Sequence, residues 1–167
     1  MSNIAHSPKD CIRANSGVFV NVFEPKPNMF IIEDMAHSLA TMPRFAGQLT
    51  RRYSVAQHCI ECCKLASKEN KLAALMHDTP EAYLLDIPTP IKSKLPFYKE
   101  VENTMMAVIA KKFKFEFPFD PEIKVIDKRM LDIEWENLMI NDNPNFVVLT
   151  PVQAKKQFLK LFYELTK

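Results

Sequence analysis

Two side chains with metal-binding chemistry, His77 and Asp78, are adjacent in the middle of the sequence, at the start of HDTPEAYLLDIPTPIKS. Together, an imidazole nitrogen and a carboxylate oxygen suit Zn, Mn, Fe or Co better than Ca. The residues around the pair predict an apolar helical segment, in which an uncompensated charge would be costly to bury. A divalent metal ion would account for the pair, and His58 could supply a second imidazole.

A fourth ligand is expected from the helix predicted over residues 121–139, which carries two aspartates, Asp127 and Asp132. Because five positions separate these two, they lie about 140° apart around a helix, so only one should face inward. Apolar residues surround Asp127, whereas charged residues surround Asp132. We therefore expect Asp127 to be the ligand, and a salt bridge from it to Lys124 or Arg129 is the alternative.

Two further carboxylates, Glu81 and Asp86, follow the His-Asp pair. Glu81 lies one helical turn after His77 and can face the same cleft, where it could orient or deprotonate a water molecule. A solvated carboxylate is the alternative for Glu81 alone. Asp86 precedes Ile87 and Pro88, so the proline restrains its surroundings and holds its carboxylate in a defined direction. A metal ion beside such carboxylates is typical of phosphoester hydrolysis.

Helices must hold these side chains. Apolar residues at the helical period predict a helix over residues 32–42, which Pro43 ends. Ser54 can cap the next helix, from Val55 to about Lys68, and this helix carries His58.

The helix predicted over residues 72–84 carries the His-Asp pair, and Pro80 should kink or locally unwind it beside the expected ligands. Residues 87–90 contain two prolines and are expected to be extended or turned. Thr150 and Gln153 form the capping box of a last helix. Further helices are predicted over residues 98–113, 121–139 and 151–167.

Strands have a minor part in the predicted fold. A β-branched and aromatic run over residues 18–23 predicts one short strand, and residues 146–149 could form a second that pairs with it. The polar residues 1–15 are expected to be loosely held. We therefore predict an all-α fold, with at most a minor two-stranded β ribbon, in a single domain over residues 1–167.

Composition narrows the functional classes. The chain has 167 residues, of which 47% are hydrophobic and 25% charged, as in an ordinary globular domain. A net charge of +2 is too small to indicate general binding to nucleic acid or to a membrane surface. No apolar run reaches membrane-spanning length, and the N-terminus does not resemble a signal peptide. A cytoplasmic location is expected.

Three of the cysteines, Cys59, Cys62 and Cys63, fall close together on one predicted helix, and the fourth is Cys11. Residues so close on a helix are badly placed to form disulfides with one another. We expect reduced thiols that pack as small core residues, in preference to a metal-binding or redox role.

The order of His58, His77-Asp78 and Asp127 resembles the pattern H…HD…D of the HD-domain metal-dependent phosphohydrolases. The stretch HDTPEAYLLDIPTPIK is similar to the HD-x-x-E-x-x-x-x-D-[LI]-P-T-P-x-K stretch of the 5′-deoxynucleotidase branch, and RRYSVAQH resembles its first-histidine motif. The segment FEPKPNMFIIEDMAHSLATMPRFAG is similar to compact bacteriophage HD hydrolases, among them dATP triphosphohydrolases. The resemblance covers about residues 16–140.

This resemblance implies a compact HD-domain helical bundle that holds a divalent transition metal (Zn, Co, Mn or Fe), with Mg as a candidate second ion. It assigns the catalytic carboxylates to Glu81 and Asp86, and a substrate contact near the phosphate or sugar to Arg44. Two departures leave the base preference open. Phage relatives usually have RFGGH where this chain has RFAGQ, and the nucleotidase branch often has Trp where Phe45 stands.

Several residues are expected to bind substrate. Arg44, Phe45 and Gly47 follow the helix-ending Pro43 in a loop and are expected to line the sugar and base pocket. Phe45 could stack on a base or pack in the core. Lys92, after the proline-rich turn, and Arg51 could meet the phosphates, although exposed basic residues often only aid solubility.

The expected function is a metal-dependent phosphohydrolase of deoxynucleotides, foremost a dNTP (dATP) triphosphohydrolase that releases deoxynucleoside and triphosphate. One alternative is a 5′-deoxynucleotidase that acts on monophosphates. Hydrolysis of cyclic dinucleotides or guanosine tetraphosphate, and a non-enzymatic HD regulatory module, are weaker alternatives. The expected partners are a small nucleotide substrate and further copies of the chain, because nine methionines and twelve phenylalanines provide much apolar surface.

Overall fold

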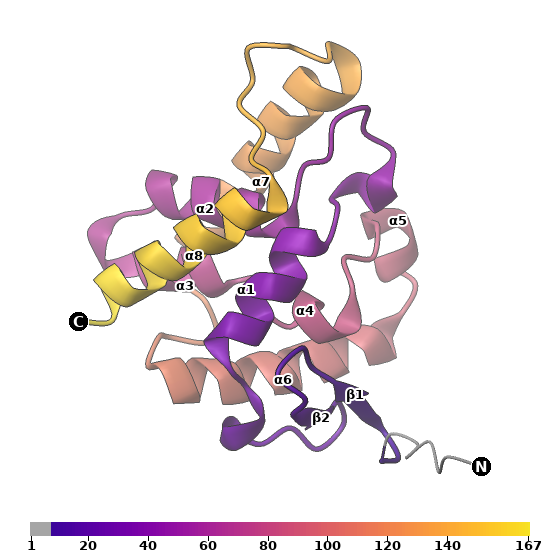
Figure 1. The fold of residues 1–167 in the computed structure, drawn as a ribbon, viewed down its shortest axis with the longest axis vertical. Coiled ribbons are helices and arrows are strands. Elements are labelled where there is room, and N and C mark those ends of the chain that lie inside the picture. The colour runs from indigo at the N-terminus through magenta and orange to yellow at the C-terminus, as the bar shows by residue number, and fades with distance from the viewer. Residues whose placement is uncertain (1–7) are drawn as a thin grey trace.

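The computed structural model describes residues 8–167 as a bundle of helices with one small ribbon of two strands (Figure 1). This confirms the predicted all-α fold with a minor β ribbon. Short helical turns also occur: η1 (Pro27–Met29), η2 (Phe45–Gly47), η3 (Lys68–Asn70) and the π-helical η4 (Trp135–Ile140). The α-helices are α1 (Ile32–Thr41), α2 (Val55–Leu65), α3 (Lys71–Met76), α4 (Glu81–Leu84), α5 (Thr89–Lys92), α6 (Pro96–Phe113), α7 (Pro121–Glu134) and α8 (Pro151–Leu165).

The ribbon pairs β1 (Cys11–Arg13) with β2 (Phe19–Asn21) in antiparallel register. Gly17, with a φ of 95°, lies in the turn between them, and the buried carboxylate of Asp34 in α1 accepts two hydrogen bonds from Ser16. The prediction that the first fifteen residues are loosely held is therefore wrong for β1, and its part on residues 1–7 lies outside the described residues.

Residues 146–149, predicted to pair with the first strand, form no strand. They are extended along α2 instead, where the buried amide of Gln57 donates to the carbonyl of Val147 at 2.8 Å and accepts from the backbone N–H of Leu149 at 2.7 Å. A side-chain amide thus satisfies the backbone groups that a neighbouring strand would have paired.

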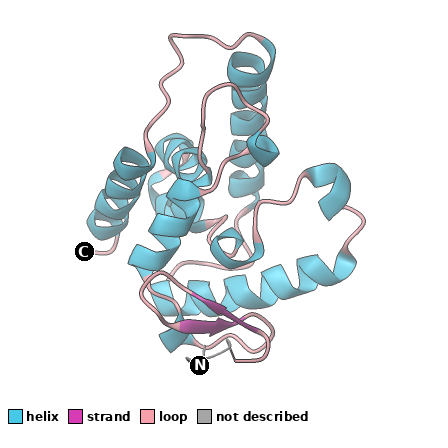
Figure 2. Ribbon diagram, turned by 45° about the vertical axis from the view of Figure 1, so that its right-hand side comes forward, coloured by secondary structure: helices cyan, strands magenta, loops and turns pink. Residues whose placement is uncertain are grey.

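The core lies where α1, α2, α3 and α8 meet, and α8 packs across α1 and α2 (Figure 1). Apolar faces of these helices contribute its residues, including the fully buried Leu39, Ile60 and Phe158. Helix α6 and the ribbon lie beside each other at the bottom of the view in Figure 2, and both add buried residues to this core: Met105 and Ile109 from α6 and Val20 from β2. Among residues 8–167, we find no helix with the length and hydropathy needed to span a bilayer.

Local capping explains where the helices begin. Ser54 accepts a hydrogen bond from the backbone of Gln57 at the start of α2, and Thr150 and Gln153 form the capping box of α8. Both predicted caps are confirmed. In α7, Asp120 caps the first turn by accepting from the backbone N–H of Glu122.

The helix predicted over residues 72–84 is interrupted where the His-Asp pair occurs. Helix α3 ends at Met76, a turn covers residues 77–80, and α4 begins at Glu81. The predicted unwinding at Pro80 is confirmed, because a proline lacks the N–H that would continue the α3 ladder. The stretch over 87–90 was expected to be extended or turned, and this is confirmed for residues 87 and 88 but wrong for residues 89 and 90, which begin the short helix α5 with Pro90 in its first turn.

The fold predicts a large stability loss for Phe158→Ala. Phe158 is fully buried in α8, so its truncation leaves a cavity and should lower the free energy of unfolding by about 3–5 kcal/mol. The matched control, Val152→Ala, changes a residue of the same helix that is 78% exposed and should cost less than about 0.5 kcal/mol. Urea denaturation measures both, and similar midpoints would contradict this assignment of the core.

Candidate metal centre

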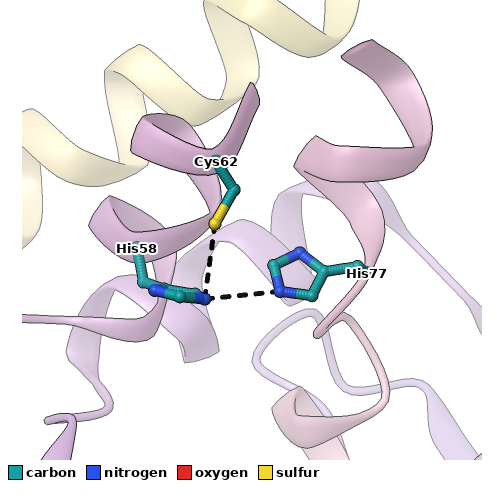
Figure 3. Close-up of side chains that lie close together, drawn as sticks. All are labelled: His58, Cys62 and His77. Atoms are coloured by element: carbon teal, nitrogen blue, oxygen red, sulfur yellow. Dashed lines mark hydrogen bonds between the residues drawn. The ribbon is translucent and has the colours of Figure 1, made fainter. Parts of the chain in front are cut away.

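Three elements bring the predicted ligands together. His58 comes from the first turns of α2, His77 and Asp78 come from the turn that ends α3, and Asp127 comes from the middle of α7. The ring of His58 is fully buried and that of His77 nearly so, whereas the two aspartates also reach solvent. Figure 3 shows that the two rings turn nitrogen atoms toward each other.

The donor atoms of these residues converge. The Nε2 atoms of His58 and His77 are 3.3 Å apart. Asp78 Oδ2 lies 3.6 Å from the first of these nitrogens and 3.3 Å from the second. Asp127 Oδ1 lies 3.1 Å from the first and 3.9 Å from the second.

The other ring nitrogens decide which way the lone pairs point. His58 Nδ1 lies 2.6 Å from a carboxylate oxygen of Glu134, and His77 Nδ1 lies 2.8 Å from the carbonyl oxygen of Ala74. Both oxygens are acceptors, so both Nδ1 atoms are assigned a proton, and each ring, when its Nε2 is deprotonated, directs that lone pair into the site. Two imidazole lone pairs and two carboxylates then face one point, which requires a positive charge there.

The distances fit one metal ion. Ligand atoms about 2.0–2.2 Å from an ion lie about 3.0 Å apart in octahedral and about 3.4 Å apart in tetrahedral arrangement. The distances in the site span 3.1–3.9 Å, close to both arrangements. Nitrogen and carboxylate donors together suit a divalent transition metal, as the sequence predicted. The donor set therefore fits the implied ion.

Protons are the alternative source of positive charge. Burial lowers the pKa of His58, as does the nearby charge of Arg44. The carboxylates of Glu134 and Asp127 outweigh both and hold the pKa of His58 well above its usual range. Burial likewise lowers the pKa of His77, but Asp78 and Asp127 outweigh burial and hold this pKa well above its usual range. Metal binding would thus release protons and weaken as the pH falls.

Glu134 is a functional residue that the sequence analysis missed. Its carboxylate is fully buried at the end of α7, where Oε1 accepts from His58 Nδ1 and Oε2 accepts from Arg44 Nη2 at 3.0 Å and Nε at 3.2 Å. Burial raises the pKa of Glu134, but His58 and Arg44 outweigh it and keep the pKa below its usual range. The spacing could have revealed it, because Glu134 follows Asp127 by two helical turns and shares its face.

Two thiols lie beside the imidazoles. Cys62 Sγ is 3.5 Å from His58 Nε2, and Figure 3 shows it one helical turn along α2. Cys59 is fully buried near His77, and burial raises the pKa of its thiol. All four cysteines are free, and Cys59, Cys62 and Cys63 are buried. Cys62 lies close enough to His58 and His77, and Cys59 to His77 and Asp78, for the thiols to be further candidate donors to a metal ion, so their packing role stays a prediction.

A cleft with a volume of 760 Å³ opens over the site. Asp78 and Asp127 line it, and so do the two predicted catalytic carboxylates, Glu81 and Asp86. The Oε2 atom of Glu81 is buried without a hydrogen-bond partner within residues 8–167. Such an orphaned oxygen fits a site that receives a water molecule or a substrate oxygen.

Among residues 8–167, two positively charged side chains line the cleft, Arg44 and Lys92. Arg44 is held by Glu134 and lies 3.9 Å from Asp78. Lys92 Nζ lies 2.6 Å from Glu102 and 3.5 Å from Glu81. Both cations are partly neutralised by carboxylates, and they lie next to Asp78 and Glu81 respectively.

Two of the residues predicted to contact substrate lie outside the lining of the cleft. Arg51 does not line the cleft, because its guanidinium binds Asp142 and the carbonyl oxygens of Asn143 and Phe146. Gly47 is also outside the cleft lining, although Phe45 lines it. The rejected ligand candidate, Asp132, lines the cleft and is exposed, and its side chain makes no hydrogen bond or ion pair with the described residues.

The position of Glu134 predicts an effect on metal affinity without loss of a ligand. In Glu134→Gln the neutral amide no longer holds the protonated Nδ1 of His58 as strongly, so Zn²⁺ affinity should fall by about 10- to 100-fold. Competition with a metal-binding dye measures this affinity. Glu136→Gln, two residues further on an exposed face, is the control and should bind as the unchanged protein does. Equal affinity of both variants would remove Glu134 from the centre.

Known proteins provide an independent comparison. No family model matches the chain. YfdR of Escherichia coli K12 is 41% identical over 128 residues, which cover 77% of this chain and 72% of YfdR. RCAP_rcc00048 of Rhodobacter capsulatus is 36% identical over 111 residues, which cover 60% of this chain and 57% of that protein. Both relatives are named as uncharacterized proteins and so bring no activity to the comparison. The extent of the first match shows that the chain belongs to the family of YfdR.

Proposed function

We propose that this protein is a cytoplasmic, metal-dependent phosphohydrolase of deoxynucleotides built on an HD domain. The observation that carries the proposal is that the Nε2 atoms of two imidazoles lie 3.1–3.9 Å from the oxygens of two carboxylates, and that these carboxylates line a 760 Å³ cleft. The resemblance to phage hydrolases favours a dNTP, with dATP foremost. Water would cleave the bond between the 5′ oxygen and phosphorus, releasing deoxynucleoside and triphosphate.

Glu81 is the proposed acid-base group. When bound, a divalent ion would lower the pKa of a water molecule and neutralise phosphate charge. Burial, together with the charges of Asp78 and Asp86, raises the pKa of Glu81 well above its usual range. A carboxylate so tuned can accept a proton from the attacking water near neutral pH and pass it to the departing 5′ oxygen.

Asp86 and the cleft cations support this chemistry. Burial raises the pKa of Asp86, whose carboxylate lines the same wall as Glu81 and can orient the water or a sugar hydroxyl. Arg44 and Lys92 can contact phosphate oxygens, since exchanging a carboxylate partner for a phosphate preserves charge pairing.

A 5′-deoxynucleotidase activity on monophosphates is a second candidate, and one observation favours it. A triphosphate carries more negative charge than a monophosphate and would use more cations. Within residues 8–167, Arg44 and Lys92 are the cations of the cleft, while Arg51 is engaged elsewhere. The chromatographic identity of the product, triphosphate or phosphate, separates the two activities.

Self-association is also part of the proposal. Several large apolar side chains are exposed on the surface of the chain, and contact with a second copy would bury them. They include Phe23, Leu85, Ile91 and Phe97, with exposed fractions of 48%, 63%, 56% and 63%. The other proposed partner is the nucleotide substrate, and neither nucleic acid nor a membrane is proposed as a partner.

The ligand set predicts which variants lose metal. His77→Ala and Asp127→Ala each remove a donor atom, so both should be purified with far less bound transition metal and should be inactive. Asp132→Ala is the matched control, because it removes an aspartate of the same cleft, five residues further along α7. Elemental analysis of the purified proteins measures metal content. Full metal in the first two variants and loss in the control would overturn the assignment.

The proposed role of Glu81 predicts that metal binding and hydrolysis can be separated. Glu81→Gln should retain its metal but hydrolyse deoxynucleotides about 10²- to 10⁴-fold more slowly, the scale for deleting a positioned acid-base group. The assay is incubation with Mn²⁺ or Co²⁺ and a panel of dNTPs and dNMPs, followed by chromatography, with a chelator as the metal-free control. If the unchanged protein hydrolyses none of them, the proposed function fails. If the variant is as fast as the unchanged protein, only the role of Glu81 fails.

A further inference from the structure

An aromatic wall lies in the cleft away from the metal ligands. Trp135, the single tryptophan of the chain, is the first residue of η4 and is 49% exposed. It faces Phe45 of η2, with ring centroids 6.0 Å apart and ring planes at 51°. Both rings line the cleft, and so does Met139. None of these contacts was expected from the sequence, which pointed to Phe45 alone.

The position of Trp135 relative to the metal ligands follows from α7. Asp127, Leu131 and Trp135 recur every four residues, and all three line the cleft. At the rise of an α-helix, the row extends about 12 Å from the aspartate to the indole. This length is comparable with that of a nucleotide from its phosphate to its base. The row changes from charged through aliphatic to aromatic along the same direction.

The buried ion pair of Arg44 and Glu134 lies next to both rings. Trp135 directly follows Glu134, whose carboxylate is anchored by His58 and Arg44. The guanidinium of Arg44 also lies 5.6 Å from the centre of the Phe45 ring. The network that holds His58 therefore also holds Glu134, the chain neighbour of Trp135, and contacts Phe45 through Arg44.

The backbone at Phe45 carries strain that the core does not explain. Phe45 and Ala46 have φ values of 54° and 51°, a region that favours glycine. Neither side chain is buried, so the strained turn does not serve core packing. It directs the Phe45 ring toward Trp135. Strain of this kind is commonly found at binding sites.

We propose that Trp135 and Phe45 form the platform that binds the nucleobase, with Trp135 as the residue that determines affinity for it. The inference rests on the proposed function, because it takes the phosphates to lie at the metal end. Every base has a flat π face, so an indole stacks on it without reading its edge. The half-exposed indole at the open end of the cleft would then be covered when a nucleotide binds.

Because the chain has one tryptophan, its fluorescence tests the platform directly. The metal-loaded Glu81→Gln protein is titrated with dATP and, separately, with inorganic triphosphate, which has no base. We expect saturable quenching by dATP and little change with triphosphate. Saturable binding of dATP, followed by calorimetry, without any change in emission would overturn the proposal.

Substitutions provide the second arm. Trp135→Leu, made in the same Glu81→Gln background, should weaken dATP binding by about 5- to 150-fold, the scale for losing one stacked base, and leave triphosphate binding unchanged. Trp135→Phe should restore most of the affinity. Ile140→Ala, at the other end of η4, is the control: Ile140 is 64% exposed, lies outside the cleft, and should have no effect. Unchanged dATP affinity in Trp135→Leu would overturn the proposal.

The two proposals can fail separately. Hydrolysis of dATP with the same KM in Trp135→Leu as in the unchanged protein would remove the platform and leave the phosphohydrolase. Binding of dATP that depends on Trp135, in a protein that hydrolyses no nucleotide, would keep the platform and remove the proposed activity. If Trp135→Leu does not fold, Trp135→Phe and the fluorescence titration still decide.

Discussion

The buried carboxylate of Glu134 is the interaction on which the site depends. It accepts from His58 on α2 and from Arg44 on the loop before η2, and it belongs to the last turn of α7. A buried carboxylate without partners would cost several kcal/mol, so the two donors and the acid are mutually required. One charge network thereby orients His58, a proposed metal ligand, and Arg44, a cation of the cleft.

Interruption of a helix is the second constraint. If the segment from α3 to α4 continued as one regular helix, adjacent residues would point about 100° apart. The turn over residues 77–80 lets His77 and Asp78 present donor atoms 3.3 Å apart, and it starts α4 at Glu81. Pro80 causes this break because it lacks the backbone N–H that would continue the helix. The proposed ligand pair and the acid-base candidate Glu81 both lie at this interruption.

The sequence predicted what depends on local rules and missed what depends on distant partners. The caps at Ser54 and Thr150, and the break at Pro80, follow from nearby residues and are present. The prediction that residues 146–149 pair with the first predicted strand was wrong, because strand pairing is decided by packing against the rest of the chain. Glu134 was missed for the same reason: a glutamate looks like a solvated helix residue until His58 and Arg44 are brought to it.

The distances along the chain between members of the centre have a consequence for how it is assembled. His58 and Glu134 are separated by 76 positions, and Arg44 and Glu134 by 90. Closing such long loops is a feature of slow, non-local steps in folding. The unfolded chain therefore holds no preformed set of donors, so the free energy of ion binding adds to the free energy of folding. A newly made chain would complete the proposed metal site only after its last third had been synthesised and docked.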